Sequence, residues 1–231
     1  MSEANDLIVS IHIPKTGGET FREVLEAMTD GHLQRDYGDR PLAPATIRQR
    51  FRLATARPHL DPGTRAVHGH FIATKYWRRF PDARYMAWFR EPVERLASHY
   101  HYWKRKPDRA NPTCRRLIEE DLSLEAFAAL PEMRDVQSRF VGEVPVEHLA
   151  FVGLTERYDE SIELFRRAFY PELAAASARQ NANPDRQGDR YALDPSVRTA
   201  IERLNAADMA LYVAAGDRFE ALLAEHAAVL A

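Results

Sequence analysis

The sequence predicts an α/β protein in which a central, mostly parallel sheet is flanked by helices in three layers. Three observations lead to this prediction. Short apolar runs rich in β-branched residues recur along the chain, stretches with helical periodicity separate them, and a Gly-Gly pair joins the first run to the first of these stretches. Strands separated by helices favour parallel pairing within one sheet.

The first half of the chain contains two of the predicted strands. Residues 7–13, LIVSIHI, form an apolar run typical of a buried strand. Residues 19–29 carry a helical stripe of apolar side chains. Residues 30–63 are rich in Pro, Gly, Asp and Arg, and we expect a loop or a small helical excursion there. A second strand is expected over residues 65–71, RAVHGHF.

The middle of the chain contains the other two predicted strands. Residues 84–89, RYMAWF, form the third strand and lead directly into a helix. Pro92 suits the first turn of that helix, where a missing N–H costs no hydrogen bond. Residues 114–141 are expected to be largely helical, and residues 149–154, LAFVGL, form the fourth strand.

The last third of the chain is predicted to be mostly helical. Thr155 is expected to cap the helix that follows the fourth strand. Residues 181–189, NANPDRQGD, are expected to form a loop, and two amphipathic helices follow from Pro195 onward. No repeat, low-complexity tract or linker divides the sequence, so residues 1–231 are predicted to form a single domain.

Composition excludes some classes of function. The chain has 231 residues, of which 45% are hydrophobic and 29% charged, as in ordinary globular proteins. Because the formal net charge is -2, bulk charge gives no argument for a nucleic-acid partner or for an anionic membrane surface. We therefore expect no nucleic acid among the partners of this protein.

The sequence also carries a prediction of location. Cys114 is the only cysteine, which excludes an intrachain disulfide and fits a reducing compartment. The N-terminus lacks the basic region and the apolar stretch of a signal peptide, and no apolar run approaches the length of a transmembrane helix. These features predict a soluble, cytoplasmic protein without a transmembrane segment.

The loop between the first strand and its helix is a candidate anion site. Residues 11–21 read IHIPKTGGETF, and a glycine loop that opens a helix directs backbone N–H groups and the positive end of the helix dipole at one point. Lys15 adds a full charge, Thr16 and Thr20 add hydroxyl groups, and Gly17 and Gly18 let the backbone approach a ligand closely. The alternative is a tight turn with an exposed lysine. The usual phosphate loop has its lysine after the glycines, whereas Lys15 precedes them.

A second candidate site follows the third predicted strand. Arg90 stands at the carboxyl end of that strand, where ligands of open α/β sheets bind, and its planar guanidinium suits phosphate. Ser98 lies eight residues later, about two helical turns away, so one face of the helix could present it beside Arg90. The alternative is an ion pair between Arg90 and Glu91 or Glu94.

Taken together, these segments resemble the carbohydrate sulfotransferases that use 3'-phosphoadenosine 5'-phosphosulfate (PAPS). HIPKTGGETF resembles the 5'-phosphosulfate loop of that family, and FREPVERLASHY resembles its 3'-phosphate motif. The branch that is most similar contains the heparan and dermatan uronyl 2-O-sulfotransferases and their bacterial relatives. Further similar segments run in the expected order to about residue 220, among them VHGHF, DVQSRFVG, FVGLTERYDESIELF, NANPDRQG and DMALYVAAGDRF. The resemblance implies a P-loop-like three-layer fold.

The resemblance also implies which residues form the site. The 5' end of PAPS would be held by Lys15, Thr16, Gly17, Gly18, Glu19 and Thr20, with the acid of Glu19 facing away from the sulfate, and its 3'-phosphate by Arg90 and Ser98. His70 of VHGHF would be the general base, with His68 supporting it or contacting the substrate. Lys15 would stabilise the charge that builds on the leaving phosphate. Gln137 and Arg139 would help to enclose the adenosine or the active site.

Some features of the sequence leave the acceptor open. Where close glycosaminoglycan enzymes carry an arginine three residues before the loop lysine, this chain has His12, which is a candidate substrate-binding residue together with Gln137 and Arg139. The segments at 74–80 and 101–109 mix cations with aromatics, as sugar-binding surfaces do, but such mixtures are also common on solvated helix faces. The acceptor is expected to be a carbohydrate or another hydroxyl compound, and the oligomeric state cannot be read from the sequence.

Other functions compete with this hypothesis. His68 and His70 could begin a metal site, but the sequence shows no third ligand, and no metal is expected. A P-loop kinase is the second enzymatic possibility, although the third strand ends in Arg90 where a metal-binding carboxylate would be needed. A nucleotide-binding or polyanion-binding protein without catalysis is the third.

Overall fold

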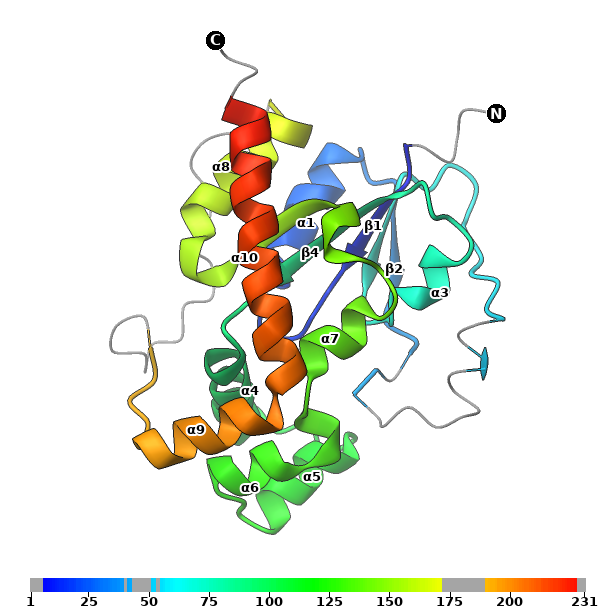
Figure 1. Ribbon diagram of the computed structural model, residues 1–231. Helices are drawn as coiled ribbons and strands as arrows, with labels where there is room; N and C mark the ends of the chain where they lie inside the picture. Colours follow the sequence, from blue (N-terminus) through cyan, green and yellow to red (C-terminus); the bar gives the residue numbers. More distant parts are fainter. Residues whose placement is uncertain (1–5, 40, 43–50, 53–54, 172–189, 228–231) are drawn as a thin grey trace.

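The computed structural model describes residues 6–39, 41–42, 51–52, 55–171 and 190–227. It confirms the predicted α/β class, because parallel strands form a central sheet with helices packed against it (Figure 1). The strands are β1 (Ile8–Ile11), β2 (Leu33–Asp36), β3 (Ala66–Gly69), β4 (Arg84–Phe89) and β5 (Leu149–Leu154). Their order across the sheet is β2-β3-β1-β4-β5, and all pairs are parallel.

This strand order creates a switch point between β1 and β4. The chain that leaves β1 goes on to β2 on one side of the sheet, whereas the chain that leaves β4 goes on to β5 on the other side. The two connections therefore run in opposite directions from the carboxyl ends of two neighbouring strands, β1 and β4. In open α/β sheets, the crevice at such a point is where ligands bind.

The helices account for most of the remaining described chain. They are α1 (Gly18–Met28), α3 (Thr74–Trp77), α4 (Pro92–Arg105), α5 (Pro112–Glu119), α6 (Leu124–Ala129), α7 (Val136–Val141), α8 (Tyr158–Phe169), α9 (Pro195–Leu204) and α10 (Ala206–Ala227). Short 3-10 turns cover Pro131–Met133, Val146–His148 and Thr155–Arg157. None of the described helices is long and apolar enough to cross a membrane.

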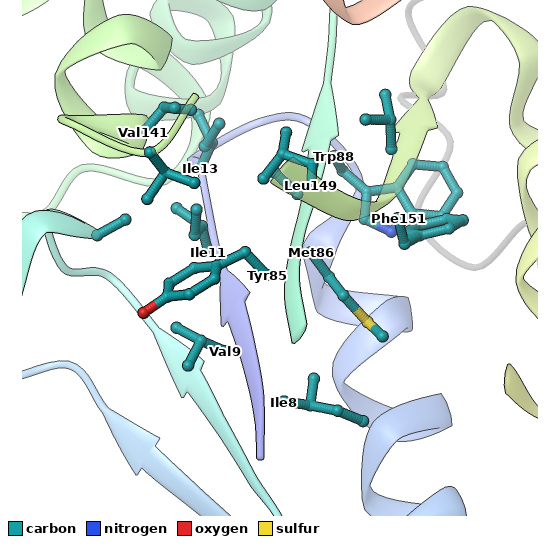
Figure 2. Close-up of a cluster of buried hydrophobic side chains, with 14 of the residues drawn as sticks. Ile8, Val9, Ile11, Ile13, Tyr85, Met86, Trp88, Val141, Leu149 and Phe151 are labelled. Atoms are coloured by element: carbon teal, nitrogen blue, oxygen red, sulfur yellow. The ribbon is translucent and has the colours of Figure 1, made fainter. Parts of the chain in front are cut away.

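Aromatic side chains attach α1 and α8 to one face of the sheet. Phe21 of α1 and Phe165 of α8 have ring centroids 4.8 Å apart, and both rings lie close to Phe151 of β5, at 5.5 and 5.2 Å. Figure 2 shows Met86 and Phe151 on the side of the sheet that faces α1. These rings are almost completely buried, and burial of large apolar surfaces is the main stabilising term for such a layer.

The opposite face of the sheet is covered by α3 and α7. Trp77 of α3 packs against Tyr85 of β4 with ring centroids 5.3 Å apart. Figure 2 shows Tyr85 together with Val9 on this face and Val141 of α7 beside Ile13. Helix α10 runs along the edge formed by β5 and also contacts α7 and α8.

A second hydrophobic cluster lies beyond the carboxyl ends of the strands. It is formed by α4, α5, α6 and α9, which gather at the lower end of the view in Figure 1. Its fully buried side chains include Leu96, Phe127, Met133 and Ile201. Because α4 starts directly after β4, this cluster holds α4 in place next to the switch point.

Most of the predicted elements are present. The four predicted strands correspond to β1, β3, β4 and β5, and the expected helices appear after 18, within 112–141 and after Pro195. Pro92 occupies the first turn of α4, as predicted. The loop expected over residues 181–189 lies outside the described residues, and part of 30–63 does as well.

Two of the predictions are wrong. Residues 30–63 contain β2, a strand that lacks an apolar run and forms the edge of the sheet. This strand pairs with β3 at Gly69, where a Cβ atom would come within 1.8 Å of the Asp36 carbonyl oxygen. Thr155 does not cap α8, because the residue before α8 is Arg157 and makes no side-chain cap. The Thr155 hydroxyl donates instead to the carbonyl groups of Thr16 and Phe89.

Candidate functional site

The loop after β1 has a tightly specified conformation. Lys15 and Gly17 both have positive φ angles, of 70° and 98°, and Gly17 directly precedes α1. A positive φ is unfavourable for a residue with a Cβ atom, so Lys15 is held there by its surroundings. The Thr16 hydroxyl donates to the carbonyl of Ile13 at 2.9 Å, and the carbonyl of Thr16 accepts from Thr155 at 2.8 Å. The first bond closes the loop on itself, and the second joins it to the carboxyl end of β5.

The structure brings Arg90 to this loop. Arg90 follows β4, is only 7% exposed, and donates through Nη1 to the carbonyl oxygen of Lys15 at 3.3 Å. Glu94, one of the acids considered as its partner, forms its described ion pair with Arg198 at 2.7 Å. The two predicted cationic residues, Lys15 and Arg90, therefore lie next to each other at the switch point, on loops that leave neighbouring strands.

Helix α4 completes this side of the site. The Lys15 ammonium lies 3.8 Å from the centre of the Tyr102 ring, a cation–π contact that connects the loop to α4. Ser98 precedes Tyr102 by four residues, so both side chains lie on the same face of the helix. Ser98 is half-buried. The face of α4 that carries Ser98 thus turns toward the loop that carries Lys15.

Three histidines and a tyrosine gather beside the loop. The ring of His12 lies 4.8 Å from His68 and 4.5 Å from His70, measured between centroids. Tyr37, just beyond β2, covers the group, with its ring 4.9 Å from His70 and its hydroxyl 3.0 Å from Nδ1 of His12. We call these four residues the histidine cluster. They come from the carboxyl ends of β1, β2 and β3, which lie side by side in the sheet.

The two histidines of the VHGHF segment have different surroundings. His68 is buried, and its Nδ1 lies 2.9 Å from the Ser10 hydroxyl, on the strand paired with β3. His70 follows the end of β3 and is only half-buried. The Nε2 atoms of both rings are buried and have no hydrogen-bond partner in the part of the chain that the structure describes. Of the two, His70 is the more accessible to an incoming molecule.

Burial keeps these histidines neutral. It lowers the pKa of His68 to about 3, with further lowering from His70, Arg22 and Arg35. Burial lowers the pKa of His70 to about 4. The pKa of His12 is also well below its ordinary value, first because of burial and then because of its histidine neighbours. At neutral pH each ring therefore has a nitrogen lone pair that can accept a proton or a hydrogen bond.

Gly18 and Thr20 lie in the first turn of α1, where the loop packs against the histidine cluster. A Cβ atom on Gly18 would come within 2.4 Å of Cδ2 of His12, so glycine is what lets that ring lie against the first turn of α1. Thr20 is almost fully buried in the same turn. The side chain of Glu19 lies outside what the structure describes.

Gln137 and Arg139 contact backbone groups of the protein. The amide of Gln137 makes two hydrogen bonds to the backbone of Arg90, accepting from its N–H at 3.0 Å and donating to its carbonyl at 2.8 Å. The guanidinium of Arg139 donates to carbonyl groups of the chain, including those of Leu42 and Arg134. In the structure, Gln137 thus joins α7 to the end of β4, and Arg139 joins α7 to the chain at Leu42 and Arg134.

Tyr37 is the member of the cluster that sequence reasoning missed. It lies in the segment that was expected to be a loop, and no motif marks it. The chain around it is anchored because Lys75 contacts Asp36 at 2.6 Å and Asp39 at 3.1 Å, while the Tyr76 hydroxyl donates to Asp36 at 2.8 Å. Lys75 and Tyr76 belong to the mixed segment 74–80, so these two side chains serve to fix the chain on either side of Tyr37.

No protein-family model and no curated protein matches the chain. The described residues contain no group of three or more His, Cys, Asp or Glu side chains arranged to hold a metal ion.

Proposed function

We propose that this protein transfers a sulfuryl group from PAPS to an acceptor hydroxyl, and that the acceptor is a carbohydrate. The observation that carries the proposal is the contact of 3.3 Å between Nη1 of Arg90 and the carbonyl oxygen of Lys15. This contact joins the segment that resembles the 5'-phosphosulfate loop to the segment that resembles the 3'-phosphate motif. The two segments meet at the switch point of the sheet, where a nucleotide would be expected.

The residues of the two loops fit a ligand with two anionic ends. The first end would be held by the N–H groups of the loop before α1, an eleven-residue helix whose dipole favours an anion, and by Lys15. Arg90 and Ser98 would hold the 3'-phosphate, because a guanidinium can donate two parallel hydrogen bonds to a phosphate group. When bound, PAPS supplies a sulfuryl group attached to a good leaving phosphate.

Lys15 is suited to neutralise charge at the reacting end. Its backbone carbonyl is fixed by Arg90, and its ammonium is placed over the Tyr102 ring. Such a side chain stabilises negative charge without having to reorganise when the charge appears. The half-buried position of Lys15 strengthens this effect, since fewer water molecules screen it.

His70 is the favoured general base. It is the more accessible of the two histidines in its segment, since His70 is half-buried whereas His68 is buried. Burial lowers its pKa to about 4, so the ring is neutral at pH 7 and has a nitrogen lone pair, but without a ligand it is a weaker base than an ordinary histidine. An anion bound nearby would raise this pKa and make His70 a stronger base.

The histidine cluster also offers a surface for a sugar. Tyr37 is 41% exposed as a residue although its ring packs against His70, so it presents an aromatic side chain beside the proposed base. Aromatic side chains pack against the apolar faces of sugar rings. This arrangement supports a carbohydrate acceptor. The predicted cytoplasmic location stays a prediction.

A binding experiment tests the proposal before the acceptor is known. The bisphosphate product PAP, added without magnesium, should raise the melting temperature of the protein well above the value measured with ADP. Arg90→Ala should abolish this difference, because it removes the guanidinium assigned to the 3'-phosphate. Equal stabilisation by ATP and magnesium would favour a kinase instead.

Turnover is the second test. Labelled PAPS is incubated with a panel of glycans and small hydroxyl compounds, and the products are scored by mass. We expect His70→Ala to abolish transfer while PAP still binds. Tight binding of PAP without transfer to any member of the panel would favour a nucleotide-binding protein without catalysis.

A further inference from the structure

Gln137 occupies an unusual position next to the candidate site. It is fully buried near the start of α7, 47 residues along the chain from Arg90, yet its side-chain amide bonds to both backbone groups of that arginine. Its Oε1 accepts from the N–H of Arg90 at 3.0 Å, and its Nε2 donates to the carbonyl of the same residue at 2.8 Å. This pairing resembles one rung of a β-ladder made by a side chain.

Arg90 needs such a partner because it stands where the sheet ends. Strand β4 ends at Phe89, and α4 begins at Pro92. The backbone groups of Arg90 therefore lie beyond the described strand ladder and before the first turn of the helix. A buried N–H or carbonyl group that lacks a hydrogen bond is costly, so the amide of Gln137 both satisfies these groups and fixes their direction.

Gln137 is itself held by helix α10. The carboxylate of Asp208, which is fully buried, accepts from the N–H of Gln137 at 3.0 Å and from that of Ser138 at 2.7 Å. In return, the carboxylate of Asp135 accepts from the N–H groups of Ala207 and Asp208. The starts of α7 and α10 are thus joined reciprocally, and this joint fixes the backbone from which Gln137 extends.

We propose that Gln137 is the positioning residue of Arg90: it sets the backbone from which the guanidinium reaches the loop at Lys15. Its importance for binding a 3'-phosphate rests on the proposed function. The positioning itself is a property of the fold and can be measured without any ligand.

The chain offers a closely matched control. Asn205 is also fully buried, and its amide also makes two hydrogen bonds to backbone groups, accepting from Asp135 at 3.0 Å and donating to Ile201 at 2.9 Å. Replacing either side chain by Ala removes a buried amide and two bonds. Only the replacement of Gln137 removes bonds to Arg90, whereas Asn205→Ala removes the acceptor of the Asp135 N–H in the joint between α7 and α10. Gln137→Met retains the volume of the side chain and serves as a second variant that leaves little cavity.

The first measurement is amide hydrogen exchange at Arg90, followed by NMR in the full chain without ligand. We expect exchange to become at least about tenfold faster in Gln137→Ala and Gln137→Met, because the Arg90 N–H loses its acceptor. In Asn205→Ala it should change by less than about threefold. Unchanged protection of Arg90 in Gln137→Met would overturn the proposal, because this variant removes the acceptor of the Arg90 N–H while it retains the volume of the side chain.

The second measurement is the ratio of the affinities for PAP and ADP. We expect it to fall by about tenfold in both Gln137 variants, since a displaced guanidinium loses its advantage toward the 3'-phosphate, and to be retained in Asn205→Ala. A wild-type protein that does not prefer PAP would refute the proposed function, and hydrogen exchange would then decide the positioning role alone. A wild-type preference that survives in Gln137→Met would overturn the positioning role.

Discussion

Replacing Gly18 by Ala should place a methyl group inside the histidine cluster. The new Cβ atom would lie 2.4 Å from Cδ2 and 2.8 Å from Nε2 of His12, well inside contact distance. His12 cannot yield easily, because its ring is 8% exposed, stacks on His68 and is bonded to the Tyr37 hydroxyl. The backbone of Gly18 is not in the left-handed region, so the clash is the main consequence of the substitution.

The magnitude follows from these contacts. Forcing an extra methyl group into a packed site costs about 1–3 kcal/mol. Displacement of His12 also weakens its bond to Tyr37, which adds up to about 1 kcal/mol because that tyrosine is partly exposed. We therefore expect the free energy of unfolding to decrease by about 2 kcal/mol in Gly18→Ala. Gly216→Ala is the control, since a Cβ atom there meets nothing within 4 Å.

Urea denaturation at pH 7.5 measures the effect, and a double-mutant cycle assigns it to His12. The control Gly216→Ala should stabilise the protein by about 0.5–1 kcal/mol, as expected for a glycine replaced inside a helix. In a His12→Ala background, Gly18→Ala should cost less than about 0.5 kcal/mol, because the ring that the methyl group would strike is gone. The reasoning is refuted if Gly18→Ala costs the same in both backgrounds, or costs nothing in the wild type.

Three other predictions follow from the described contacts. Because burial lowers the pKa of His68 to about 3, the folded protein binds fewer protons than the unfolded chain below pH 6.5. The stability that comes from keeping His68 neutral is therefore complete above pH 6.5 and is lost as the pH falls toward 3. His68→Asn removes this contribution, so it should reduce the slope of the unfolding free energy against pH by about 1.4 kcal/mol per pH unit between about pH 6 and 4. Equal slopes in the wild type and the variant would contradict this prediction. Gly69→Ala should cost about 3 kcal/mol or more in urea denaturation, because its Cβ would lie 1.8 Å from the Asp36 carbonyl oxygen and separate β2 from β3; a neutral result would contradict the close approach. Ser161→Ala should cost about 1–3 kcal/mol in the same assay, since it removes the acceptor for the buried Leu154 N–H at 2.9 Å; a loss below about 0.5 kcal/mol would show that this N–H finds another partner.

The order of the strands and helices could be predicted from local patterns. Residues 84–89 are almost continuously apolar, which is what a strand buried on both faces requires, and they form β4. The loop before α1 was recognisable from the glycines that follow Lys15, because a tight turn into a helix needs them. In contrast, β2 has the sequence LQRD, and its strand conformation depends on pairing with β3 rather than on an apolar run.

The sequence by itself determined the α/β class and the chemical types of the site residues, since periodicity, glycines and charge are local properties. Only the tertiary structure decided which of them meet. The approach of Arg90 to Lys15, the amide of Gln137 on the backbone of Arg90, and the position of Tyr37 over His70 all join residues distant in sequence. Such contacts depend on strand order and on buried polar groups finding partners, and these are settled only when the whole chain packs.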